Sequence, residues 1–209
     1  MTGETGVDER NRRALDRVIM FSDGVFAIAI TLLALDLRLP PLSEPSSAAL
    51  LQALAANAPR FLSFVLSFGV TGIFWLAHQR MFSLIARFDR GLALVNLLFL
   101  MSIAVMPFST MLIGEYGDLK AATAFYSGSL VFTSVTSNLL WMYAARGRRL
   151  LDPQVSRADV RVTTARSVVT LVMFVASFGL AFVSVTAARI AWVLTVVAAR
   201  LAERLARRR

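Results

Sequence analysis

Four long stretches of this sequence contain no aspartate, glutamate, lysine or arginine, and they restrict the chain to folds that place helices in a membrane. The stretches cover residues 61–77, 91–114, 121–145 and 167–188. A helix needs roughly 20 apolar residues to cross the hydrocarbon core of a bilayer. A fifth stretch, residues 18–35, is apolar apart from Asp23 and the small polar residues near it. Long uninterrupted segments of this kind are typical of transmembrane proteins.

A sixth span has to be drawn from the C-terminal part of the sequence, where Arg189 interrupts an otherwise apolar run. Residues from about 162 to about 201 leave room for two spans, with a tight turn expected near residues 186–189. The sequence therefore predicts an all-α, polytopic membrane protein that forms a single six-helix domain over residues 1–209. The predicted spans lie at about 18–38, 60–81, 91–113, 121–145, 162–184 and 187–205.

The distribution of basic residues predicts the topology independently of hydropathy. Arginines cluster in residues 10–17, 80–90, 146–166 and 200–209, whereas the other connections hold only Arg38, Arg60, Lys120 and Arg189. Six spans put all four clusters on one side, and positive charge favours the cytoplasmic side. We therefore expect both termini in the cytoplasm and a multi-pass protein of the cell membrane. The net charge of +9 then reflects topology, and we expect no nucleic-acid partner.

The composition also excludes several kinds of chemistry. The chain has no cysteine and one histidine, which removes disulfides, thiol nucleophiles, cysteine zinc sites and any two-histidine metal site. A Ser22, His78 and Asp23 triad is disfavoured, because neighbouring residues on a helix point about 100° apart. We therefore expect neither an enzyme nor a resident cofactor or metal.

The first predicted helix separates its small and aliphatic residues from its polar ones. At about 100° per residue, one stripe contains Gly24, Ile28, Thr31, Leu32 and Leu35. Ser22 and Asp23 point away from this stripe. An acid within a span is costly and usually marks a functional position or a buried network. The same pattern is also compatible with ordinary bundle core in which Asp23 is a satisfied buried acid.

Polar residues on the next two predicted helices are candidate partners for Ser22 and Asp23. Trp75 and His78 lie three residues apart near the end of the second span, and Asn96 lies at a similar depth in the third. A cluster of these five side chains would satisfy each member where water is scarce. We expect Arg17 to anchor the edge of the membrane instead of binding Asp23 directly.

The segment Arg17-x-x-x-Phe21-Ser22-Asp23 resembles the signature of the transmembrane protein 175 family of lysosomal and prokaryotic potassium channels. The resemblance extends through residues 24–35, the Trp75 and His78 pair and the six-span length. It implies six-span subunits that assemble as homotetramers, with the first helices lining a pore for potassium ions in the lipid bilayer.

The resemblance also implies roles for individual residues. Ile28 matches the family's hydrophobic constriction, Leu32 and Leu35 match further apolar rings, and Thr31 matches a hydroxyl position linked with selectivity. Ser22 and Asp23 match residues that bond the second and third helices and hold the pore helix in place. The chain lacks the Thr-Val-Gly-Tyr-Gly carbonyl filter of other potassium channels.

The predicted function is a potassium-permeable channel with an aliphatic constriction, and other functions stay open. A proton-coupled transporter would use Asp23 and His78 as a relay. A membrane scaffold would carry no ions. Asp36 fits either a cation-concentrating ring at the outer mouth of the pore or a solvated helix end.

Overall fold

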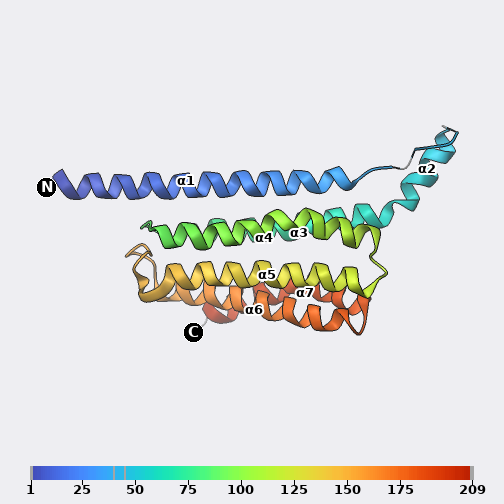
Figure 1. Ribbon diagram of the computed structural model, residues 1–209. Helices are drawn as coiled ribbons and strands as arrows, with labels where there is room; N and C mark the ends of the chain where they lie inside the picture. The colour runs from blue at the N-terminus through green and yellow to red at the C-terminus, as the bar shows by residue number, and fades with distance from the viewer. Residues whose placement is uncertain (1, 40, 45, 208–209) are drawn as a thin grey trace.

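The chain folds into long, roughly parallel helices (Figure 1). The structure is a computed structural model that describes residues 2–39, 41–44 and 46–207. The α-helices in this part of the chain are α1 (Thr2–Leu33), α2 (Ser47–Ala56), α3 (Ala58–Phe82), α4 (Arg90–Glu115), α5 (Lys120–Ala145), α6 (Arg157–Ala181) and α7 (Val185–Arg207). Short 3-10 helices follow α1 at Ala34–Asp36 and α5 at Arg146–Arg148. The described residues contain no β-strand beyond one isolated bridge between Ile85 and Leu151.

The predicted boundary between the last two helices is wrong. The structure ends α6 at Ala181 and begins α7 at Val185, so residues 186–189 lie inside α7 instead of forming the turn. Arg189 is tolerated in the first turns of α7 because its guanidinium donates a hydrogen bond of 2.6 Å to the carbonyl of Gly117. A charged residue in an apolar run therefore marked a contact with the loop between α4 and α5, not a chain reversal.

Five helices of the described chain are long and apolar enough to cross a membrane: α1, α3, α4, α6 and α7. The remaining long helix, α5, has a lower mean hydropathy in its most apolar stretch than these five because it is rich in serine and threonine. Seven of its polar side chains are buried: Thr123, Ser127, Thr133, Ser134, Thr136, Ser137 and Asn138. Hydroxyls inside a helix bundle are stabilised by bonds to neighbouring helices and to the carbonyl one turn earlier.

The hydroxyls of α5 connect it to helices on both sides. Ser109 of α4 lies 2.8 Å from Ser129, and Ser127 lies 3.2 Å from Ser177 of α6. The indole of Trp192 in α7 also donates to Ser127 at 3.2 Å. α5 thus lies between α4 and the α6–α7 pair, whereas α1 packs against α3 and α4 at the edge of the bundle (Figure 1).

A polar clasp joins two connections at one end of the bundle. The backbone of residues 84–87 pairs with residues 150–152. Asp89 accepts a capping bond of 2.7 Å from the Leu92 amide, and its carboxylate also binds Tyr143 and Arg149 at 3.0 Å and 2.5 Å. Partial burial of Asp89 acts to raise its pKa, but these bonds outweigh it and hold the pKa of Asp89 below its ordinary value.

This clasp predicts a pH-dependent stability. Because the pKa of Asp89 is lowered in the folded state, its stabilising contribution is complete above the ordinary aspartate pKa of about 3.9 and is lost as the pH falls through the lower folded value. Asn keeps a capping oxygen but loses the ion pair with Arg149, so we expect Asp89→Asn to lower the free energy of unfolding by about 0.5 kcal/mol at pH 7 and to flatten its acid dependence. Thermal unfolding in detergent between pH 7 and pH 3 measures both effects.

The matched control is Asp118→Asn, which alters an exposed carboxylate at the other end of α4. The control should follow the unaltered chain at every pH. If the Asp89→Asn protein and the unaltered protein lose stability equally as the pH falls, the clasp does not contribute the predicted pH-dependent free energy of unfolding.

Candidate functional site

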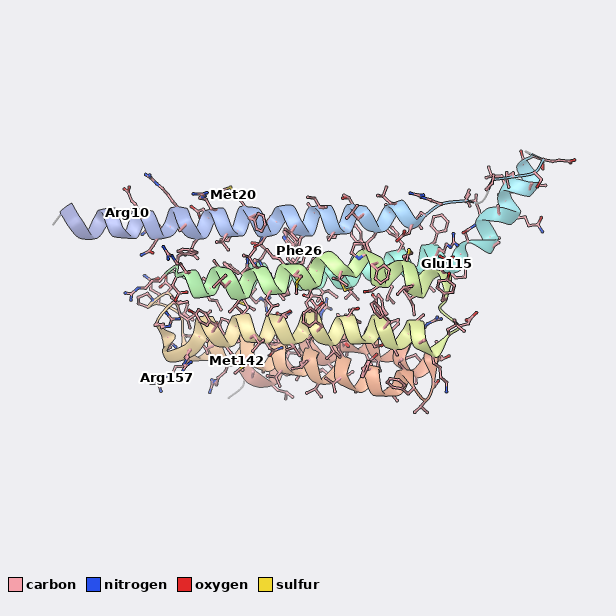
Figure 2. All side chains as sticks on the ribbon, in the orientation of Figure 1. Arg10, Met20, Phe26, Glu115, Met142 and Arg157 are labelled. Carbon is pink, nitrogen blue, oxygen red and sulfur yellow. The ribbon has the colours of Figure 1, made fainter. Side chains whose placement is uncertain are left out.

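The inner face of α1 is apolar and closely packed. Phe26, Ala29 and Leu33 are buried, and Figure 2 shows Phe26 pointing from α1 toward the rest of the bundle while Met20 points away. The Phe26 ring lies 5.9 Å from the rings of both His78 and Phe99. This face therefore docks α1 on α3 and α4.

The stripe predicted from the sequence lies on the opposite face of α1. Ile28 is 61% exposed and Leu35 is 57% exposed, and Thr31 and Leu32 are also exposed. A Cβ added at Gly24 would meet no atom within 4 Å. The stripe is therefore not part of this chain's own core, and exposed apolar side chains in such a row are available to lipid or to other chains.

Asp23 binds two side chains of α3. Trp75 Nε1 donates to Asp23 Oδ1 at 2.8 Å, and Gln79 Nε2 donates to the same oxygen at 2.5 Å. Trp75 and Gln79 are four residues apart, so they project from the same side of α3. The carboxylate is partly buried and is held by these two bonds between helices.

Ser22 and Asn96 lie in a second, fully buried group. Asn96 Nδ2 donates to Ser22 Oγ at 3.0 Å, and Ser22 Oγ donates to the Val18 carbonyl at 2.7 Å. His78 Nε2 lies 2.9 Å from Asn96 Oδ1. Because the amide oxygen only accepts, the proton in this bond belongs to His78 Nε2.

The histidine is enclosed by aromatic rings. Its ring stacks on Phe82 with centroids 4.3 Å apart and on Phe99 with centroids 5.7 Å apart. Nδ1 of His78 has no hydrogen-bond partner among the described residues. The imidazole is therefore packed between two phenyl rings and held by its bond to Asn96.

The single polar cluster expected from the sequence is thus divided into two groups. One group joins Asp23 to Trp75 and Gln79, and the other joins Ser22 through Asn96 to His78. Among the described contacts, no hydrogen bond joins Asp23 to His78. The hydroxyl of Ser22 donates to a backbone carbonyl, so the structure offers no support for a Ser22, His78 and Asp23 triad.

Gln79 was missed from the sequence, although its spacing carried a signal. It stands one helical turn after Trp75, so any acceptor that reaches Trp75 also lies within reach of Gln79. Arg17 and Phe21 of the signature are exposed and make no polar contact with either group; with Phe88 and Leu97 they line a groove between α1 and α4.

Asp36 lies at the far end of α1 and does not stand alone there. It shares a pocket of about 270 Å³ with Arg38, Arg60 and Glu115. Two guanidiniums beside two carboxylates leave little net negative charge to attract cations. Elsewhere in the described residues, no three His, Asp or Glu side chains gather as a metal site would require.

The bonds of Asp23 predict that mutating this residue weakens the docking of α1 on α3. Asp23→Ala removes the acceptor of Trp75 and Gln79 and should weaken the docking of α1 by about 2 kcal/mol, the range for a hydrogen bond to a charged group. Asp23→Asn keeps one acceptor oxygen and should lose less. Thermal unfolding and size-exclusion chromatography in detergent measure stability and assembly.

Asp16→Ala serves as the matched control, because Asp16 is an exposed carboxylate on the same helix. We expect it to leave both measurements unchanged. An Asp23→Ala protein as stable and as well assembled as this control would contradict the anchoring role of Asp23.

Comparison with known proteins identifies the relatives of this site. The family described as the endosomal/lysosomal potassium channel TMEM175 matches residues 17–107, which include both polar groups and the stripe. A potassium channel of Streptomyces collinus is 41% identical over 172 residues, covering 80% of this chain and 82% of that protein. The endosomal/lysosomal proton channel TMEM175 of Homo sapiens is 38% identical over 98 residues, covering 44% of this chain and 19% of the human protein.

A solved structure extends the likeness to the whole fold. The crystal structure of a lysosomal potassium-selective channel TMEM175 homolog from Chamaesiphon minutus matches with a TM-score of 0.79 and 31% identity over 91% of this chain and 98% of that chain. Relatives that cover four fifths or more of both chains share the architecture, not an isolated motif. This multi-pass membrane protein therefore belongs to the TMEM175 family, whose members are ion channels and not enzymes.

Proposed function

We propose that this protein is a potassium-permeable channel of the cell membrane, with a pore lined by α1 from each of four identical subunits. The observation that carries the proposal is the division of α1 into two faces. Its polar residues are satisfied inside the subunit, while its stripe of Ile28, Thr31, Leu32 and Leu35 stays exposed. The Streptomyces relative is named a potassium channel, and we take the permeating ion from that name. The number of subunits is taken from the family resemblance.

The position of α1 supports this assembly. α1 packs against α3 and α4 only at one edge of the bundle (Figure 1). Symmetric oligomers close by repeating one surface around an axis. Four copies arranged with this edge inward bring four α1 stripes to the axis and leave α6 and α7 toward the lipid.

Aliphatic side chains on such an axis form a gate. A narrow apolar throat offers a cation no replacement for its hydration shell, and it closes by dewetting. In this proposal Ile28 forms the main constriction, and Leu32 and Leu35 form further rings one and two turns later. Conduction requires the Ile28 ring to widen through a movement of α1.

Thr31 is the one hydroxyl of the stripe and is proposed to contribute selectivity. Its Oγ1 donates to the Ile28 carbonyl at 2.9 Å, so the hydroxyl proton is occupied and the oxygen lone pairs stay available to a cation. Four such oxygens replace part of a hydration shell, which favours the more easily dehydrated potassium ion over sodium.

We infer six membrane spans with both termini in the cytoplasm. α5 has 26 residues, its only charge is Lys120 at the first position, and its buried hydroxyls are bonded to α4, α6 and α7. A helix satisfied in this way crosses a membrane within a bundle despite lower hydropathy. Six crossings also keep the four arginine clusters on one side.

A proton pathway is the second candidate, because several vertebrate relatives are named proton channels. A relay through Asp23 and His78 has little geometric support. The two side chains belong to separate hydrogen-bonded groups, and His78 is enclosed by Phe82 and Phe99. A proton current carried by this chain would therefore follow the α1 axis and not these two residues.

The constriction predicts a gain of function. Ile28→Asn puts an amide at the narrowest ring, hydrates it, and should raise potassium flux roughly tenfold, the change given by a barrier about 1.4 kcal/mol lower. Potassium flux into liposomes that contain the purified protein measures the effect. Ile190→Asn is the matched control, because Ile190 is similarly exposed but lies on α7.

The two variants separate the outcomes. Flux that rises for Ile28→Asn and not for Ile190→Asn supports a pore along α1. An unchanged flux for an intact Ile28→Asn oligomer would falsify the assignment of the constriction. The reversal potential of the unaltered protein between potassium and sodium, repeated across a pH gradient, distinguishes potassium permeation from proton permeation.

A further inference from the structure

A cavity of about 90 Å³ lies away from the proposed pore, between α3, α5, α6 and α7. A buried water needs roughly 10–15 Å³ of such volume, so the cavity has room for several waters or for part of a larger ligand. α3 packs closely against α1 and α4, and this cavity borders its other side. The helix that holds Asp23 in place therefore also forms one wall of the cavity.

The lining changes from charged to apolar along the helix axis. Arg80 and Arg166 line the end near the termini of α3 and α7, where both bind Glu203. Phe74, Phe174 and Trp192 line the deeper end, and the Phe74 and Phe174 rings lie 6.0 Å apart. A cation-lined surface end and an aromatic interior end match the orientation of a lipid, with its head at the membrane surface and its chain toward the midplane.

Two hydroxyls in the wall have no partner. Ser134 Oγ and Ser167 Oγ form no hydrogen bond with the described residues, and Ser134 is 1% exposed. A buried polar group without a partner is costly, and an isolated case calls for a ligand or an ordered water. Both serines belong to the lining of the cavity, on its α5 and α6 walls.

The charged end carries more positive than negative groups. One carboxylate, Glu203, is shared by Arg80, Arg166 and Arg207. Each guanidinium has five N–H donors, so a single carboxylate leaves most of them available. A phosphate is the anion that guanidiniums bind most readily at a membrane surface.

We propose that this cavity binds an anionic phospholipid of the surrounding bilayer. The phosphate lies against Arg80 and Arg166, polar atoms of the head group meet the Ser134 and Ser167 hydroxyls, and the start of one acyl chain contacts Phe74 and Trp192. The site is separate from the α1 pore, and its occupancy is measured without any ion flux.

The test is native mass spectrometry of the full-length protein with phosphatidylglycerol added in detergent. We expect the unaltered protein to bind phosphatidylglycerol and Thr170→Phe, which fills the cavity, to bind it roughly tenfold more weakly. Val172→Phe is the matched control, because Val172 is exposed on the same helix and does not line the cavity. This control should bind as the unaltered protein does.

A second variant, Ser134→Ala, tests the same proposal if the Thr170→Phe protein fails to fold. It removes one unpartnered hydroxyl with little change in volume and should weaken phosphatidylglycerol binding several-fold. Equal binding by the unaltered protein, Thr170→Phe and Ser134→Ala overturns the proposal, as does the absence of any binding.

Three further additions identify what the site recognises. Phosphatidylcholine of the same chain length should bind more weakly, because its head group carries no net charge. Equal binding of phosphatidylcholine, which has the same phosphate but also a choline cation, would overturn the preference for an anionic phospholipid. Displacement of phosphatidylglycerol by millimolar inorganic phosphate, or by palmitate at equal concentration, would assign the site to a free anion or a fatty acid and overturn the phospholipid.

Discussion

The carboxylate in the first helix constrains the rest of the structure more than any other group. An acid in an apolar helix has no water to solvate it, so it needs donors from the same protein. Asp23 finds them in Trp75 and Gln79 of α3. These bonds, with Ser22 to Asn96 one residue earlier, fix the rotation of α1 about its own axis. Once the rotation is fixed, Ile28 and Leu35 must point outward.

The same rule explains the rest of the polar interior. α5 carries enough serine and threonine to lower its hydropathy, yet most of these hydroxyls bond a carbonyl one turn earlier or a hydroxyl on a neighbouring helix. Bonds of this kind give a membrane bundle specificity, because apolar side chains alone do not distinguish a helix from lipid. α5 therefore acts as the polar centre to which α4, α6 and α7 attach.

Much of this architecture could be predicted from the sequence. The charge-free runs locate α3 and α4, whose length and apolar content are enough to define membrane helices, and they locate α5 by the absence of charge alone. The division of α1 into two faces followed from 100° per residue alone, but that periodicity left open whether Ile28 points outward or belongs to the bundle core. Family resemblance added the roles of these residues, which periodicity does not contain.

Other features depended on contacts between distant segments. Arg189 looked like the start of a loop because the Gly117 carbonyl that satisfies it lies 72 residues earlier. Gln79 was missed because its place one turn after Trp75 becomes informative only once an acceptor on another helix is known. The polar residues divide into two groups because Ser22 and Asp23 on α1, like His78 and Gln79 on α3, are adjacent and point about 100° apart. The cavity beside α3 forms where four helices leave space, and no single segment encodes it.

The distribution of these contacts gives α1 an anchored end and a less constrained end. Both polar groups hold α1 at Ser22 and Asp23, whereas the buried residues nearer its other end, Ala29 and Leu33, are apolar. The helix then tightens into a 3-10 turn at Ala34–Asp36 before the chain leaves the bundle. Apolar contacts are non-directional, so they resist sliding and tilting less than hydrogen bonds do. A tilt about the anchored end moves Leu35 most and Ile28 least, which means that opening at Ile28 requires either a large tilt or a rotation that strains the Asp23 bonds. The hydrogen bonds that set the direction of the stripe therefore also set the energetic cost of moving it.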